Sequence, residues 1–83
     1  MRVRLKLFAT LSIYLPAGAQ DNAVDLEVEA GTTPHQLMAR HRIPFEQAHL
    51  VVVNGLFVAP SERDRLAMQE GDVLALWPPV AGG

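Results

Sequence analysis

The segment Thr32-Thr33-Pro34-His35-Gln36 is the clearest local structural signal in the chain, and it predicts the start of a helix. Thr33 is a favourable N-cap residue, and Pro34 suits the first helical position. Gln36 stands three residues after Thr33, which completes a capping box. We expect the helix to run through His41, with the basic residues 40–42 in its last turn, where cations suit the helix dipole.

Two segments before this helix alternate between apolar and polar residues, as half-buried strands do. In residues 2–8, one face carries Val3, Leu5 and Leu7, and the other carries Arg2, Arg4, Lys6 and Phe8. In residues 24–29, Val24, Leu26 and Val28 alternate with Asp25, Glu27 and Glu29. Between the two strands, a helical turn or two is expected at residues 9–14, followed by a loop.

Three further strands are expected after the helix. The continuous apolar run 49–53 indicates a strand that is buried on both faces. Asn54-Gly55 then predicts a tight hairpin turn to a short return strand at 56–58. The last strand covers 73–77 and should lie beside the first at the centre of the sheet. This order predicts an α+β fold of the β-grasp type, with one helix across one sheet.

The composition narrows the classes of protein that are compatible with this fold. A chain of 83 residues forms one small domain with a thin core. Its net charge of −2 argues against nucleic-acid binding. The absence of cysteine excludes disulfides, thiolate nucleophiles and Cys-ligated metals, and it favours the cytoplasm. We expect no signal peptide, no membrane segment and no contact with membranes.

Side chains that could carry catalysis or bind metal are scarce. His35, His41 and His49 share no face, so no metal site is expected. Ser12 and Ser61 lack the sequence context of a nucleophile, and no glycine-rich loop could hold a phosphate. We therefore expect no enzymatic activity from this chain on its own and no bound cofactor.

The C-terminus has the composition of a narrow tail. Pro78-Pro79 favours an extended conformation, and Gly82-Gly83 ends the sequence without side chains. Such a tail can thread a narrow channel and deliver its α-carboxylate, because a Cβ at either glycine would obstruct close approach of the backbone. The composition alone leaves a frayed terminus equally open.

Several segments together resemble the MoaD/ThiS sulfur carriers. The resemblance is carried by Leu7–Leu11, Gly31–Thr33, Val53–Gly55 and above all by the sequence from Gly71, Gly-Asp-Val-Leu-Ala-Leu-Trp-Pro-Pro-Val-Ala-Gly-Gly. This family includes the small subunit of molybdopterin synthase and a carrier of the thiamine pathway. It implies a ubiquitin-like β-grasp domain at residues 1–77, with a mixed four- to five-stranded sheet and one main helix. Residues 78–83 would then be an extended tail.

The resemblance also implies a function. The carboxylate of Gly83, next to Gly82, would be adenylated by an ATP-using activating enzyme and converted to a thiocarboxylate that donates sulfur. ATP would be used by that enzyme and would not be bound by this chain. Partners would be the activating enzyme and an acceptor such as the large subunit of molybdopterin synthase.

Two short motifs favour different branches of the family. Trp77 before the two prolines resembles the molybdopterin branch, which we favour. Asn54-Gly55 followed by Val58 and Pro60 is closer to the thiamine branch. Carriers for other sulfur pathways, and a ubiquitin-like modifier attached through Gly83, are alternatives.

An apolar cluster on the sheet is the expected docking surface. Strand alternation points Phe8 and Trp77 outward, and Phe57 on the return strand could join them. The competing interpretation makes Trp77 the edge of the core and Phe8 a cap on the helix. The resemblance assigns partner binding to Phe8, Phe57, Trp77, Pro78, Pro79, Val80 and Ala81.

Overall fold

The first and last strands of the protein pair in parallel within one sheet. In the computed structural model, which describes residues 1–79, β1 (Arg2–Leu7) and β5 (Val73–Trp77) align with Leu5 opposite Leu74. Backbone hydrogen bonds continue the pairing at both ends, from Arg4 N to Asp72 O and from Phe8 N to Leu76 O. The predicted adjacency of the two strands is therefore confirmed.

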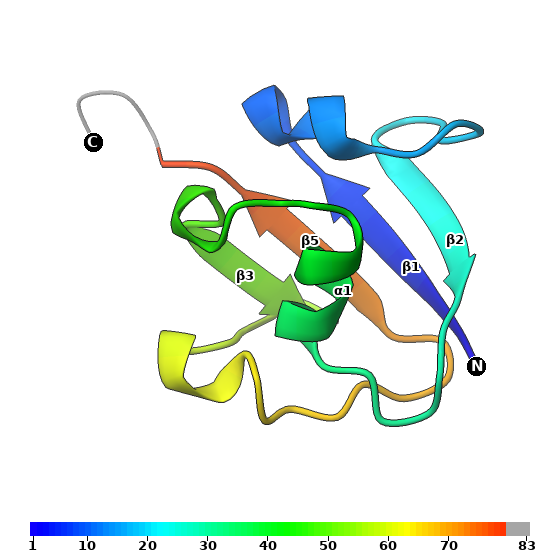
Figure 1. Cartoon of the computed structure of the whole chain (residues 1–83), viewed down its shortest axis with the longest axis vertical. Helices are drawn as coiled ribbons and strands as arrows, with labels where there is room; N and C mark the ends of the chain where they lie inside the picture. The colour runs from blue at the N-terminus through cyan, green and yellow to red at the C-terminus, as the bar shows by residue number, and fades with distance from the viewer. Residues whose placement is uncertain (80–83) are drawn as a thin grey trace.

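The other strands flank this pair. β2 (Ala23–Glu27) lies antiparallel to β1, while β3 (Leu50–Val53) lies antiparallel to both β5 and β4 (Leu56–Phe57). The five strands follow the order β2-β1-β5-β3-β4, and α1 (Pro34–Arg40) crosses one face of the sheet (Figure 1). This is the ubiquitin-like β-grasp fold that was predicted, with five strands. Three short 3₁₀ helices complete the chain: η1 (Ala9–Tyr14), η2 (Phe45–Gln47) and η3 (Pro60–Glu62).

The helix begins as predicted and ends earlier. Gln36 N donates to Thr33 Oγ1 at 3.2 Å, and Thr33 N donates to Gln36 Oε1 at 3.0 Å, so the capping box is complete. At the other end, Arg42 takes a left-handed conformation with φ of 59°. Ile43 N then donates to Met38 O, and Arg42 N to Ala39 O, which is a Schellman motif. Residues 41 and 42 thus form the C-terminal cap, and the last helical residue is Arg40.

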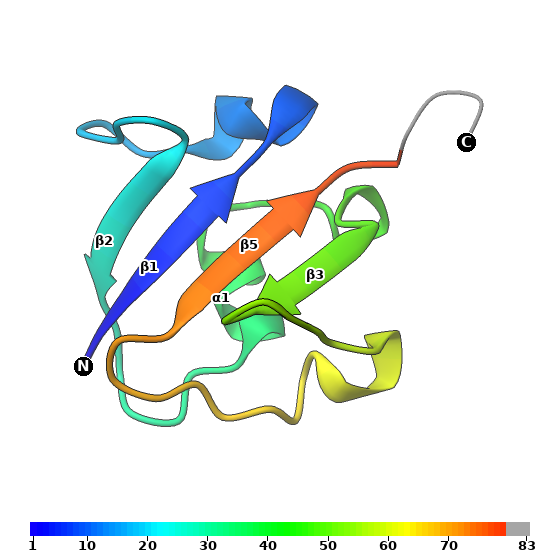
Figure 2. The ribbon, with the colours of Figure 1, turned by 180° about the vertical axis from the view of Figure 1, so that it is seen from behind.

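The strand that was predicted to be buried on both faces is buried on one. Val51 and Val53 point into the core, whereas Leu50 is 37% exposed and Val52 is partly exposed. Both faces of a strand are covered only when elements pack on both sides of its sheet. This chain has one α-helix within residues 1–79, and α1 lies on a single side (Figures 1 and 2).

The hairpin turn that was predicted at Asn54-Gly55 is present. Both residues have positive φ, 51° and 82°, as a two-residue type I′ turn requires. The Asn54 side chain also ties the turn to the start of β5. Its Nδ2 donates to Asp72 Oδ1, its Oδ1 accepts from Val73 N, and both distances are 2.8 Å.

The core lies between α1 and the covered face of the sheet. It consists mainly of aliphatic residues from β1, α1, β3 and β5, with Leu5, Leu7, Leu11, Leu37, Val51, Leu74 and Leu76 fully buried. Among residues 1–79, no helix has the length and hydropathy needed to cross a membrane.

Arg63 is a buried cation that holds three segments together. It follows η3, is only 6% exposed, and burial lowers its pKa from the usual value. Its guanidinium donates to the carbonyl oxygens of Val58, Ala48 and His49 at 3.0–3.3 Å. Its own carbonyl accepts from His35 N in α1. The side chain therefore joins the β3 and β4 segments, and its backbone joins them to the helix.

Replacing Arg63 should destabilise the protein without changing its fold class. In Arg63→Met, the carbonyls of Ala48 and Val58 lose their donors inside the protein, and we expect the free energy of unfolding to fall by about 2 kcal/mol. Urea denaturation measures this change. Arg65→Met is the matched control, since Arg65 is exposed, and it should stay within about 0.5 kcal/mol of wild type. Equal stability of the two variants would contradict the bracing role.

Candidate functional site: the open face of the sheet

Two aromatic side chains stack where β1 and β5 end. Phe8 follows β1 directly, and Trp77 is the last residue of β5. Because Leu7 and Leu76 are aligned and both buried, the next residue of each strand projects from the opposite, open face. The rings lie 4.5 Å apart between centroids, with their planes inclined by 7°. Both residues remain partly exposed, so the pair is a surface feature.

Strands β3 and β4 extend this apolar surface. Leu50 is aligned with Trp77, and Val52 is aligned with both Ala75 and Phe57, so these side chains share the open face. Phe57 is 60% exposed at the edge of the sheet. We call this set the docking surface: Phe8, Leu50, Val52, Phe57 and Trp77, around Ala75, which is itself only 7% exposed.

The structure brings the three predicted aromatics onto one face but gives them different surroundings. Phe8 and Trp77 touch each other, whereas Phe57 lies two strands from β5, with the Arg63 guanidinium carbon 6.0 Å from its ring centroid. Sequence reasoning missed Leu50 and Val52 because it assigned their strand to the interior. The presence of a single helix in the sequence was the signal that could have placed them on an open face.

The C-terminal segment leaves the sheet beside the aromatic stack. Pro78 is partly exposed and Pro79 is exposed, and both follow β5 directly. The remaining tail residues assigned from the sequence, Val80, Ala81, Gly82 and Gly83, lie outside the described residues. Figure 2 shows that β5 leads from the centre of the sheet toward this end of the molecule.

Charged side chains occupy the other half of the open face. Arg4 Nε donates to Asp25 Oδ1 at 2.7 Å, and Arg2 Nε donates to Glu27 Oε1 at 3.3 Å, across β1 and β2. The hydrogen bond from Arg4 lowers the pKa of Asp25, and the same bond raises the pKa of Arg4. The open face is thus divided into a paired polar half and an apolar half.

The histidines do not converge. His35 stacks on Phe45, with 4.3 Å between ring centroids. His41 has its Nε2 buried without a partner among the described residues, and its pKa is lowered by burial and then by Arg40. Within residues 1–79, no group of three His, Asp or Glu side chains is arranged to hold a metal ion. The histidines therefore provide no metal site in this part of the chain.

A protein-family model matches most of this sequence. The ThiS family model matches residues 6–83. No curated protein matches at a significant level.

Solved structures share the fold over at least 95% of the chain. SAMP1 from Haloferax volcanii is 28% identical, with full coverage of both chains and a TM-score of 0.68. A complex of subunits 1 and 2 of the molybdopterin-converting factor from Helicobacter pylori includes a chain that is 17% identical, with full coverage of both and a TM-score of 0.60. A putative molybdopterin-converting factor subunit 1 from Pyrococcus furiosus is 20% identical, covering 95% and 98% of the two chains, with a TM-score of 0.65.

The contact between Phe8 and Trp77 should be measurable in a double-mutant cycle. Stacked aromatic pairs contribute about 0.5–1.5 kcal/mol beyond the area they bury, so we expect a coupling free energy of about 1 kcal/mol between Phe8→Ala and Trp77→Ala. Chemical denaturation of the two single variants, the double variant and wild type gives this value. Additive single effects would show that the rings contribute independently.

Proposed function

Since this chain belongs to the ThiS family, we propose that it is a sulfur carrier whose C-terminal glycine, Gly83, is the reactive site. The observation that carries the proposal is the family match, which extends over residues 6–83 and so includes the Gly-Gly end. The domain supplies binding and no catalytic group of its own. On this proposal, the protein works in the cytoplasm and binds neither a cofactor nor nucleic acid.

The chemistry requires activation because a carboxylate is a poor electrophile. The Gly83 carboxylate oxygen attacks the α-phosphorus of ATP in a partner enzyme, and pyrophosphate leaves. Hydrosulfide from a sulfur donor then attacks the carbonyl carbon, a C–S bond forms as the C–O bond to AMP breaks, and the product is a thiocarboxylate. The glycines at 82 and 83 suit this step because no Cβ blocks approach to the nucleotide.

The docking surface supports a partner on the open face of the sheet. It combines an aromatic pair with aliphatic neighbours beside the base of the tail, and exposed apolar clusters on small domains commonly mark interfaces. A partner seated there holds the tail in a defined direction, because Pro78-Pro79 favours an extended path. The activating enzyme and the sulfur acceptor would use this surface in turn.

Within the family we favour molybdopterin synthesis, with this chain as the small subunit that docks on a large one. Trp77 before Pro78-Pro79 supports that branch. Two of the structures that share this fold are named as subunit 1 of a molybdopterin-converting factor, one of them in complex with subunit 2. The alternatives are thiamine or another sulfur pathway, or conjugation of Gly83 to target proteins. Intact mass after incubation with ATP, the activating enzyme and a sulfur donor separates an oxygen-to-sulfur exchange from conjugates.

Deleting Gly83 should abolish activation and leave the domain folded. Each residue spans about 3.5 Å, so the new carboxylate would fall that far short of the nucleotide phosphorus. ATP–pyrophosphate exchange with the activating enzyme measures activation, and thermal melting checks the domain, whose last strand ends at Trp77. Gly82→Ala should slow the exchange while keeping the full length. Normal exchange by the truncated chain would refute the carrier proposal.

Shortening an exposed aromatic of the docking surface should weaken partner binding. We expect Phe57→Ala to reduce affinity for the large partner about tenfold, or about 1.4 kcal/mol, with little loss of stability because its ring is mostly exposed. Isothermal titration calorimetry measures the affinity. Leu56→Ala is the matched control, since Leu56 is 74% exposed on the same strand and is aligned with the core-facing Val53. If Phe57→Ala and Leu56→Ala reduced the affinity equally, the open face would not be the docking site.

A further inference from the structure

Lys6 carries the sole side-chain amine in this protein. The sequence has seven Lys plus Arg residues, and the other six are arginines. A guanidinium stays protonated and does not act as a nucleophile under ordinary conditions. Any reaction that joins an acyl group to a side-chain amine of this chain must therefore take place at Lys6.

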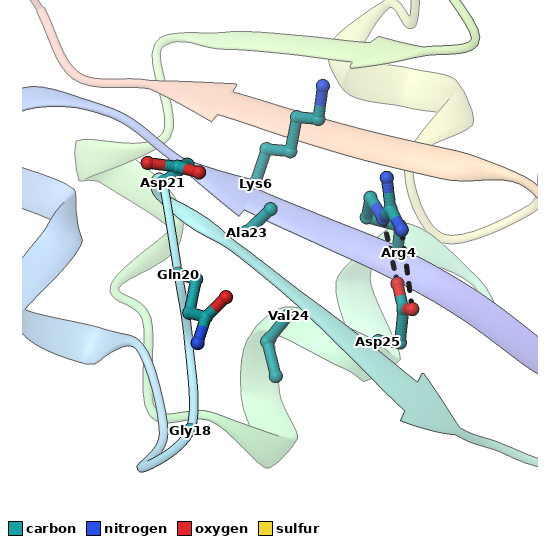
Figure 3. Close-up of a pocket in the computed structure, with 8 residues that line it drawn as sticks. All are labelled: Arg4, Lys6, Gly18, Gln20, Asp21, Ala23, Val24 and Asp25. Carbon is teal, nitrogen blue, oxygen red and sulfur yellow. Dashed lines mark hydrogen bonds and ion pairs between the residues drawn. The ribbon is translucent and has the colours of Figure 1, made fainter.

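The surroundings of Lys6 leave its amine accessible. Its neighbours in the sheet register are Ala23 on β2 and Ala75 on β5, and both have only a methyl side chain. Lys6 lines a pocket of about 400 Å³ together with Gly18, Gln20 and Asp21. In Figure 3, dashed lines join Arg4 to Asp25, whereas none reaches Lys6. Within residues 1–79, the Lys6 amine has neither a hydrogen bond nor an ion pair, although Arg2 and Arg4 beside it have both.

The other amine of the chain is the Met1 α-amine, and it is held in place. It donates to Val28 O at 2.7 Å and lies 3.9 Å from a Glu27 carboxylate oxygen. The structure disfavours acylation at Met1, because it would remove the positive charge that faces Glu27 and attach a second chain to an amine that is held against Val28 O.

We propose that Lys6 is the acceptor at which the activated carboxylate of a second copy of this chain is captured. This rests on the proposed function, which supplies the acyl adenylate. The neutral Lys6 amine attacks the Gly83 carbonyl carbon of the other copy, and a C–N bond forms as the C–O bond to AMP breaks. AMP leaves, the amine proton passes to solvent or to the Asp21 carboxylate in the same pocket, and nothing is oxidised or reduced. The small residues around Lys6 leave room for a tip that ends in two glycines.

A second copy is favoured over the chain's own tail by the direction of β5. Lys6 is level with Ala75, two residues before β5 ends at Trp77. Pro78-Pro79 favours continued extension beyond that point, so reaching the chain's own Lys6 would need a reversal. The docking surface also surrounds Ala75. A copy linked at Lys6 therefore has its docking surface obstructed.

The linkage can be tested with the full chain, ATP and the activating enzyme of the same organism, without a sulfur donor. We expect intact mass to show two chains joined with loss of one water, and peptide mapping to place the bond between Gly83 and Lys6. Lys6→Arg keeps the charge and should lose the linked species while ATP–pyrophosphate exchange is retained. A bond at Met1, or loss of water within a single chain, would overturn the proposal.

Two further measurements distinguish the reasons for absent or misplaced linkage. Exchange without any linked species overturns the Lys6 proposal alone, whereas absence of exchange overturns the sulfur-carrier proposal and this one with it. Adding Arg65→Lys to the Lys6→Arg variant moves the amine from the partly exposed position 6 to the exposed position 65, and we expect no linkage there. Linkage at the relocated amine would show that any exposed lysine serves, and the special position of Lys6 would be refuted.

Discussion

The parallel pairing of β1 with β5 is the constraint on which the rest of the structure depends. It joins the two ends of the described chain at the centre of the sheet, and it aligns Leu5 with Leu74 and Leu7 with Leu76 in the core. The same register that buries these leucines sends the next residues, Phe8 and Trp77, to the opposite face. One alignment therefore positions both the core and the aromatic stack at the base of the tail.

The small size of the chain explains why one face of the sheet is open. With one α-helix among the described residues, the protein covers a single face, and Leu50 and Val52, which point to the other face, stay exposed or partly exposed. In a larger domain a second layer of helices would cover this open face. Here a partner protein would complete the layer on the proposed function, so incomplete burial and docking have one physical origin.

The long segment between β4 and β5 is braced by polar contacts as well as by hydrophobic ones. Arg63 fills its interior with a guanidinium that satisfies three backbone carbonyls, and Asn54 and Asp72 fasten the hairpin turn to the start of β5. Buried polar groups are tolerated when each finds a partner. These contacts fix the edge that presents Phe57, so they connect the stability of the loop to the shape of the docking surface.

Local patterns determined the elements of this protein, and the tertiary structure determined which of their faces are covered. The capping box at Thr33 and Gln36, the alternation in β1 and the Asn54-Gly55 turn each depend on residues that are close in sequence, and each could be predicted from it. The exposure of Leu50 and Val52 and the buried guanidinium of Arg63 could not, because each depends on segments that meet only after folding. The cap at Arg42 is local, but it places a non-glycine residue at positive φ, which its sequence does not signal. An apolar run specifies a strand, but the number of its buried faces depends on what packs against the sheet. Likewise, alternation could point Phe8 and Trp77 outward, while only the parallel register of two strands from opposite ends of the chain could bring their rings into contact.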